Sequence, residues 1–160
     1  MNKTQAGVCA FAVDLAEQDP WAEETERKAK KLASNSKVLP VMIRMGQGLI
    51  AEAATRMGVP EGTVWDMAME SWEGASGAPD TRSAYGSLVT RVLEIFRAGD
   101  LSEEFARFLM VTPGTDVGVG FGGALDFLVA FYTQAMATYT DVDEQGTVYP
   151  RLREGWLTFA

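Results

Sequence analysis

The fold is decided by residues 117–140, which read VGVGFGGALDFLVAFYTQAMATYT. The apolar spacing predicts a helix from about Ala124 to Tyr139. Its main face holds Leu125, Leu128, Val129, Tyr132 and Met136. Phe127 and Phe131 point elsewhere, so the helix is apolar all round, which is typical of the central helix of a bundle. We therefore expect this C-terminal helix at the centre of the fold.

The same stretch is the best candidate for a membrane span, but its composition favours burial in protein. Its only charge is Asp126, which lies inside the stretch, and a central carboxylate is costly in a bilayer. The apolar stretch from Ala6 to Val13 is short and is followed by Asp14, so we expect no secretory signal. These features predict a cytoplasmic protein with no membrane partner, whose single cysteine, Cys9, is a reduced thiol.

The rest of the chain also predicts helices, because apolar residues recur every three or four positions between proline, glycine and polar loop residues. The predicted helices lie at about residues 4–18, 21–33, 40–57 and 61–73, around Tyr85–Phe96, and after Ser102. Together with the central helix, they make an all-α fold: a compact bundle of about seven helices.

The connecting segments set the domain organisation. A glycine-rich loop is predicted at residues 113–123, and short strands could form only at Phe108–Val111 and Thr147–Tyr149. The sequence GASGAPD at residues 74–80 is the clearest linker. We expect one helical domain over residues 1–160, in which that linker could mark a break between subdomains.

The composition excludes several chemistries. The chain has no histidine and one cysteine, which excludes imidazole catalysis, imidazole metal sites and thiolate zinc cages. Gly118, Gly120 and Gly123 have nucleotide-loop spacing, but no convincing strand precedes them and no lysine follows to hold a phosphate. Asp141 begins a calcium-like loop whose last ligand position is Leu152 rather than glutamate. We predict no catalytic residue, cofactor or metal; an enzyme would have to use carboxylates, Tyr, Lys or Ser.

Charge is divided unevenly along the chain. The net charge is −8, yet residues 27–60 hold seven bases and one acid, and residues 61–160 hold six bases and fifteen acids. A chain divided in this way can present a local basic face despite its acidic total. The alternative is that these charges form an ordinary solvated helix face.

Residues 49–69 carry a pattern of small and apolar residues, LIAEAATRMGVPEGTVWDMAM. The pattern consists of Ala54, Met57, Gly58, Val59, Thr63, Val64 and Met67. It resembles the helix-turn-helix unit of sigma-factor promoter-binding domains, small phage terminase subunits and many repressors. The resemblance implies that the helices touch at Ala54, turn at Gly58 and place Thr63, Val64 and Met67 inward. An ordinary helical hairpin, which uses the same residue types, is the alternative.

The second helix of this unit departs from the family pattern, in which outward residues read DNA. The outward positions here hold Glu61, Gly62, Trp65, Asp66 and Met69, and no base lies between Gly58 and Pro79. Carboxylates repel phosphate, which disfavours DNA binding by this helix. Nucleic acid would instead have to meet a basic face in residues 27–56. Its candidate residues are Arg27, Lys28, Lys30, Lys31, Arg44 and Arg56.

Three large residues of the same helix predict another use for it. Trp65, Met69 and Trp72 share one side, and tryptophan and methionine are enriched at protein interfaces. We predict an oligomeric or partner-binding surface there, with core burial as the alternative. The sequence thus favours a non-catalytic helical protein that associates with protein, as a self-assembling unit, an adaptor or regulator, or a phage-type structural or accessory component. The alternative is a helix-turn-helix DNA-binding regulator or packaging-initiation subunit.

Overall fold

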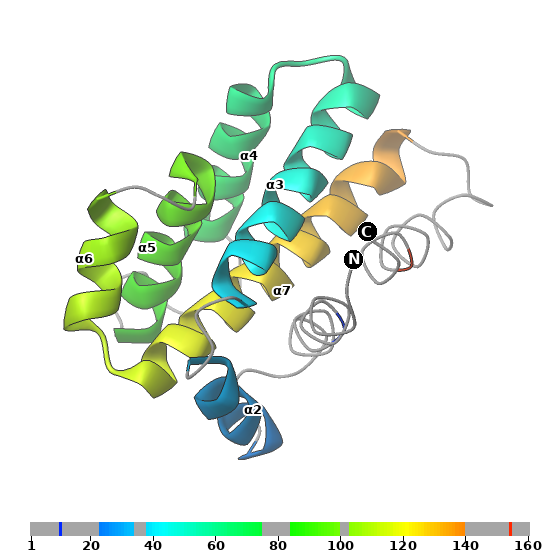
Figure 1. Ribbon diagram of the computed structural model, residues 1–160. Coiled ribbons are helices and arrows are strands. Elements are labelled where there is room, and N and C mark those ends of the chain that lie inside the picture. The colour runs from blue at the N-terminus through cyan, green and yellow to red at the C-terminus, as the bar shows by residue number, and fades with distance from the viewer. Residues whose placement is uncertain are drawn as a thin grey trace.

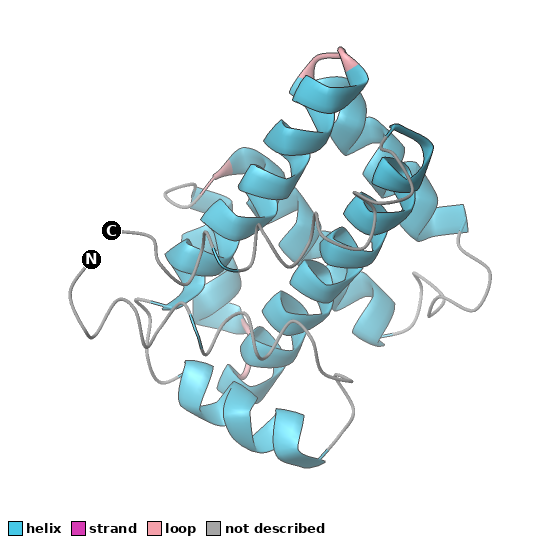
Figure 2. Cartoon of the chain, turned by 90° about the vertical axis from the view of Figure 1, so that its right-hand side faces the viewer, coloured by secondary structure: helices cyan, strands magenta, loops and turns pink. Residues whose placement is uncertain are grey.

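The computed structural model of the chain describes residues 23–33, 38–74, 84–99 and 103–139, together with Ala10 and Glu154. Within these ranges it contains six helices and no strand (Figures 1 and 2). They are α2 (Glu23–Ala33), α3 (Val38–Met57), α4 (Glu61–Gly74), α5 (Ala84–Ala98), α6 (Glu103–Val111) and α7 (Gly114–Tyr139). The all-α prediction is confirmed for this part of the chain. The predicted helix at 4–18, apart from the helical Ala10, and the tail after Tyr139, apart from Glu154, lie outside it.

Helix α7 is the central helix of the described part. It contacts α2, α3, α4 and α5, and it passes diagonally through the molecule in Figure 1. Its large fully buried side chains include Phe121, Leu125, Leu128 and Tyr132, each at most 1% exposed. Full burial of such a side chain stabilises a fold by about 1.5–3 kcal/mol. These residues belong to a single hydrophobic core that α3, α4, α5 and α6 share.

The predicted loop at 113–123 is wrong, because α7 already begins at Gly114. The amide of Val117 donates to the carbonyl of Pro113 at 3.0 Å, which starts the helix. Its glycines serve close packing rather than a turn: a Cβ at Gly120 would lie 2.9 Å from Cγ of Leu88 on α5. A Cβ carbon needs more room than this, so only glycine lets α5 and α7 approach so closely here.

The strand considered at Phe108–Val111 is also wrong, because these residues end α6. Helical spacing places Phe105 and Phe108 on one side, and each ring centre lies 6.2 Å from that of Phe121 on α7. Phe108 is fully buried, with the Arg91 guanidinium 5.5 Å from its ring centre. Burial of this aromatic pair favours the helix over a strand.

Helices α3 and α5 both pack on α7. Val89, Val92 and Phe96 of α5 are fully buried. The side-chain amide of Gln47 on α3 donates to the carbonyl of Phe96 at 3.0 Å. This bond satisfies a carbonyl in the last turn of α5, where helical carbonyls lack partners within the helix.

The turn between α3 and α4 is built on one glycine. Gly58 has a φ of 69°, in the left-handed region, and the amide of Val59 donates to the carbonyl of Ala54 at 3.1 Å. This is a glycine C-cap of the Schellman type. The carbonyl of Pro60 then accepts the amides of Thr63 and Val64, which starts α4. The chain therefore reverses within three residues, and α4 runs back beside α3 (Figure 1).

One described helix is long and apolar enough to cross a membrane by length and composition alone, over Gly114–Met136. The core helix of a soluble protein passes the same test. In this structure 56% of its apolar window is buried by the surrounding helices. The residue considered costly for a membrane, Asp126, is half-buried within the bundle.

Candidate functional site

The predicted interface residues Trp65 and Trp72 lie in the core, each only 5% exposed. The ring of Trp72 meets that of Phe127 on α7 edge-on, with centroids 5.2 Å apart. Its Nε1–H donates to Oγ1 of Thr90 on α5 at 2.9 Å, and that hydroxyl donates to the carbonyl of Gly86 at 2.8 Å. Trp72 thus joins α4, α5 and α7, and core burial, the alternative considered, holds for both indoles. Met69 is half-buried against the same core.

Helix α4 exposes only part of the outward face that the helix-turn-helix resemblance implies: Glu61, Gly62 and Asp66 are exposed, but Trp65 is buried and Met69 is half-buried. The prediction that Thr63 and Met67 point inward is wrong, because both are exposed, Met67 by 39%. The physical reason is that Trp65 points into the core, and Met67 lies about 200° further around the helix. The exposed residues of α4 are Glu61, Gly62, Thr63, Asp66, Met67, Glu70, Glu73 and Gly74.

A groove lies beside this exposed face, between α4 and α7. Its lining includes Met67, Glu70 and Ser71 from α4 and Phe131, Gln134 and Ala135 from α7. We call it the α4–α7 groove. It holds about 1090 Å³ of empty space that includes open solvent, whereas small-molecule pockets enclose most of their ligand. Its open shape therefore suits the surface of another protein chain better than a small molecule, which would need an enclosed pocket. The sequence did not predict that Met67 and Phe131 line one groove, because no sequence signal joins these distant positions.

The charged residues at this groove are acidic. Glu70 lines the groove, and Glu73 is exposed one turn further along α4. Neither carboxylate has an ion pair with the described residues. Asp66 lies toward α5, where its Oδ1 is 2.9 Å from Nη1 of Arg97. Neither α4 nor α7 contains a lysine or arginine, so the helices that form the groove present no base.

Three of the four predicted basic residues of α2 lie within ion-pair distance of acids of the same helix. Arg27 lies 3.5 Å from a carboxylate oxygen of Glu24, and Lys28 lies 3.8 Å from the same oxygen. Lys30 lies 3.6 Å from Glu26. The side chains of Lys30 and Lys31 are exposed. Each such exposed pair contributes at most about 1 kcal/mol, but it reduces the local positive charge that a phosphate would meet.

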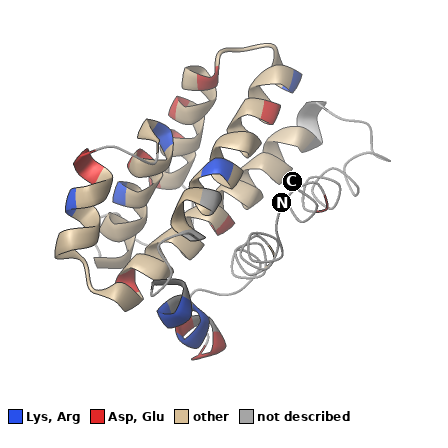
Figure 3. Ribbon diagram, viewed as in Figure 1, with Lys and Arg blue, Asp and Glu red and all other residues tan. Residues whose placement is uncertain are grey.

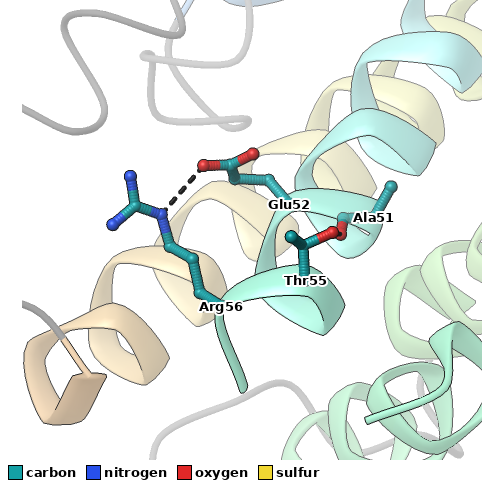
Figure 4. A network of polar contacts seen from close by, with 4 residues as sticks. All are labelled: Ala51, Glu52, Thr55 and Arg56. Atoms are coloured by element: carbon teal, nitrogen blue, oxygen red, sulfur yellow. Dashed lines mark hydrogen bonds and ion pairs between the residues drawn. The ribbon is translucent and has the colours of Figure 1, made fainter. Parts of the chain in front are cut away.

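The two predicted basic residues of α3 lie apart from each other. Nε of Arg56 donates to Oε1 of Glu52 at 2.8 Å, beside the Thr55 hydroxyl that donates to the Ala51 carbonyl (Figure 4). Arg44 is exposed and lies about 18 Å from Arg56 along the helix, at 1.5 Å per residue. In Figure 3 the Lys and Arg residues of α2 gather at the bottom of the molecule, on a helix separate from α3, whereas Arg56 lies in the last turn of α3. The structure therefore does not gather the six predicted residues into one patch.

No group of three or more His, Cys, Asp or Glu that could hold a metal ion occurs among the described residues. Cys9 and the calcium-like turn at Asp141 lie outside them. Comparison of the chain with protein-family models, with curated proteins and with solved structures found no match. The resemblance of residues 49–69 to helix-turn-helix units therefore stays a prediction.

Proposed function

We propose that this chain is a non-catalytic cytoplasmic protein that acts by associating with protein. It would serve as a self-assembling unit, an adaptor or regulator, or a phage-type structural or accessory component. The observation that carries this proposal is the α4–α7 groove, which the exposed Met67 lines together with Ala135 and the edge of the largely buried Phe131. Apolar side chains at an open groove favour burial against another protein, and methionine adapts its shape to a partner.

The rigidity of α4 also supports the proposal. Trp72 is held by Thr90 and by Phe127, and Asp66 is paired with Arg97 of α5. A surface that is already ordered loses less conformational entropy when it binds. Helix α4 therefore offers its outward side chains on a fixed support.

The test combines light scattering at micromolar concentration with retention of partner proteins on the immobilised full chain. We expect a defined oligomer or a retained protein, and Met67→Glu should weaken either one. Met110→Glu is the control, because Met110 is 86% exposed on α6 and does not line the groove. A chain that stays monomeric and retains no protein would contradict the proposal.

The alternative function is DNA binding by the basic face in residues 27–56. The observation that favours it is Arg44, which is exposed and has no ion pair with the described residues. It predicts salt-dependent retention of duplex DNA that is lost when Lys28, Lys30, Lys31 and Arg56 are changed to Glu. Absence of retention at low salt would exclude it.

A further inference from the structure

We propose that the α4–α7 groove binds an amphipathic helix of another protein, whose apolar stripe is flanked by lysine or arginine. The inference rests on the proposed function and deepens it, because it names the chemistry of the partner. It depends on three features: the place of the groove between two helices, its apolar side chains, and the nearby carboxylates of Glu70 and Glu73, which have no ion pair with the described residues.

The place of the groove fits a helical occupant. It lies between α4 and α7, two helices joined by the contact of Trp72 with Phe127. A third helix can lay its side chains into such a groove, with anchors at positions i, i+3, i+4 and i+7. The groove is too open to enclose a small ligand, whereas a helix laid along it would cover both edges at once.

The side chains at the centre of the groove select apolar anchors. Phe131 packs against Phe127 with ring centroids 6.3 Å apart, so its position is fixed. Ala135 is half-buried and small, which leaves space above it. Met67 stands at the opposite edge, exposed and flexible. Phe131 is only 9% exposed, so leucine-like side chains would remove mainly Met67 and Ala135 from water.

The charges at the groove select a cationic partner. Glu70 lines it and Glu73 lies one turn away, and neither has an ion pair with the described residues. Because α4 and α7 contain no base, lysines flanking an apolar stripe would meet carboxylates and no opposing cation. Each exposed ion pair contributes at most about 1 kcal/mol, so two pairs together can change affinity by about tenfold, and they also set partner choice and association rate.

A second copy of this chain is a poorer occupant. Its cationic helix α2 also carries Glu24 and Glu26, which already lie within ion-pair distance of Arg27, Lys28 and Lys30. Helix α2 also contacts α7 of its own chain. We therefore assign the groove to a helix from a different protein.

The experiment uses the full chain and two labelled synthetic helices of about 14 residues, with leucines at helical spacing and either lysine or glutamate elsewhere. Fluorescence anisotropy at about 0.15 M salt measures binding, and amide chemical shifts locate it. We expect the Leu/Lys helix to bind and the Leu/Glu helix not to bind. The shifts should concentrate in residues 67–74 and 131–135.

Two charge-matched double variants decide whether the groove is responsible. Glu70→Lys/Glu73→Lys should weaken binding by about tenfold or more, because two attractions become repulsions. Glu94→Lys/Glu103→Lys changes the net charge equally, at exposed positions on α5 and α6 that do not line the groove, and should change binding by less than about twofold. Circular dichroism checks that both variants keep the helical fold.

Three outcomes would overturn the inference: no binding of the Leu/Lys helix, equal weakening in both double variants, or shifts concentrated elsewhere. Equal weakening of binding in both double variants would mean that only the net charge of −8 attracts the Leu/Lys helix. These failures are distinct from failure of the proposed function. If the chain oligomerises or retains a protein but does not bind the Leu/Lys helix, then it associates with protein through other chemistry. A monomer that retains no protein refutes the proposed function itself.

Discussion

Two glycines of α3 lie two residues apart and have opposite surroundings. A Cβ added at Gly46 would lie 2.6 Å from Cδ2 of Phe96 and 2.9 Å from Cδ1 of Leu128. A Cβ added at Gly48 would meet nothing within 4 Å. Phe96 and Leu128 are both 0% exposed, so neither can move aside without disturbing the core. Gly46→Ala therefore overpacks the junction of α3, α5 and α7, whereas Gly48→Ala does not.

The magnitude follows from two opposing effects. Alanine for glycine within a helix stabilises by up to about 1 kcal/mol, and both variants gain this. Overpacking of a core costs about 1–3 kcal/mol, and only Gly46→Ala incurs it. We expect the free energy of unfolding of Gly48→Ala to exceed that of Gly46→Ala by about 1–3 kcal/mol.

Urea unfolding followed by far-UV circular dichroism measures this difference, provided that both variants share one denaturant slope. Because the two substitutions are chemically identical and lie in one helix, the helix-propensity gain cancels. If Gly46→Ala proved as stable as Gly48→Ala, then α5 and α7 would not meet α3 at Gly46, and the packing described above would be refuted.

Three further substitutions test individual contacts. Gly58→Ala should lower the free energy of unfolding by about 1 kcal/mol in thermal or urea unfolding, because a φ of 69° strains a side chain; an unchanged stability would refute the turn. Trp72→Phe combined with Thr90→Val should show a coupling of about 0.5–1.5 kcal/mol in a double-mutant cycle, which measures their hydrogen bond. A coupling near zero would mean that the indole has another partner. Asp66→Ala should destabilise by less than about 1 kcal/mol, an effect that disappears at high salt, because its pair with Arg97 is largely exposed; a larger, salt-independent loss would contradict this.

Much of the helical fold could be predicted because apolar spacing identifies a buried face without knowledge of its partner. Val89, Val92 and Phe96 share one face of α5 in the sequence and are buried in the structure. The start of α7 could not be predicted in this way. Gly120 and Gly123 are read as helix breakers, and their packing role depends on Leu88 and Tyr85, which approach only in the folded chain.

The candidate site was harder to predict, because α4 has apolar residues on too wide an arc to indicate which side is buried. The contacts of Trp72 with Thr90 and Phe127 fix that orientation, and both partners lie on other helices. One local signal was present in the sequence and not used. Glu52 precedes Arg56 by four residues, a spacing that predicts the observed ion pair and a smaller free positive charge on the basic face.

The most direct test of protein association through α4 places a photo-crosslinking phenylalanine analogue at position 67 of the full chain. Irradiation in cells that express this chain should give adducts that contain a second polypeptide and that protease digests. The Glu70→Lys/Glu73→Lys change should remove them, whereas adducts from the same analogue at position 110 should not depend on that change. Two results would contradict the account: adducts from position 67 that are digested by nuclease, or recovery of the uncrosslinked chain alone.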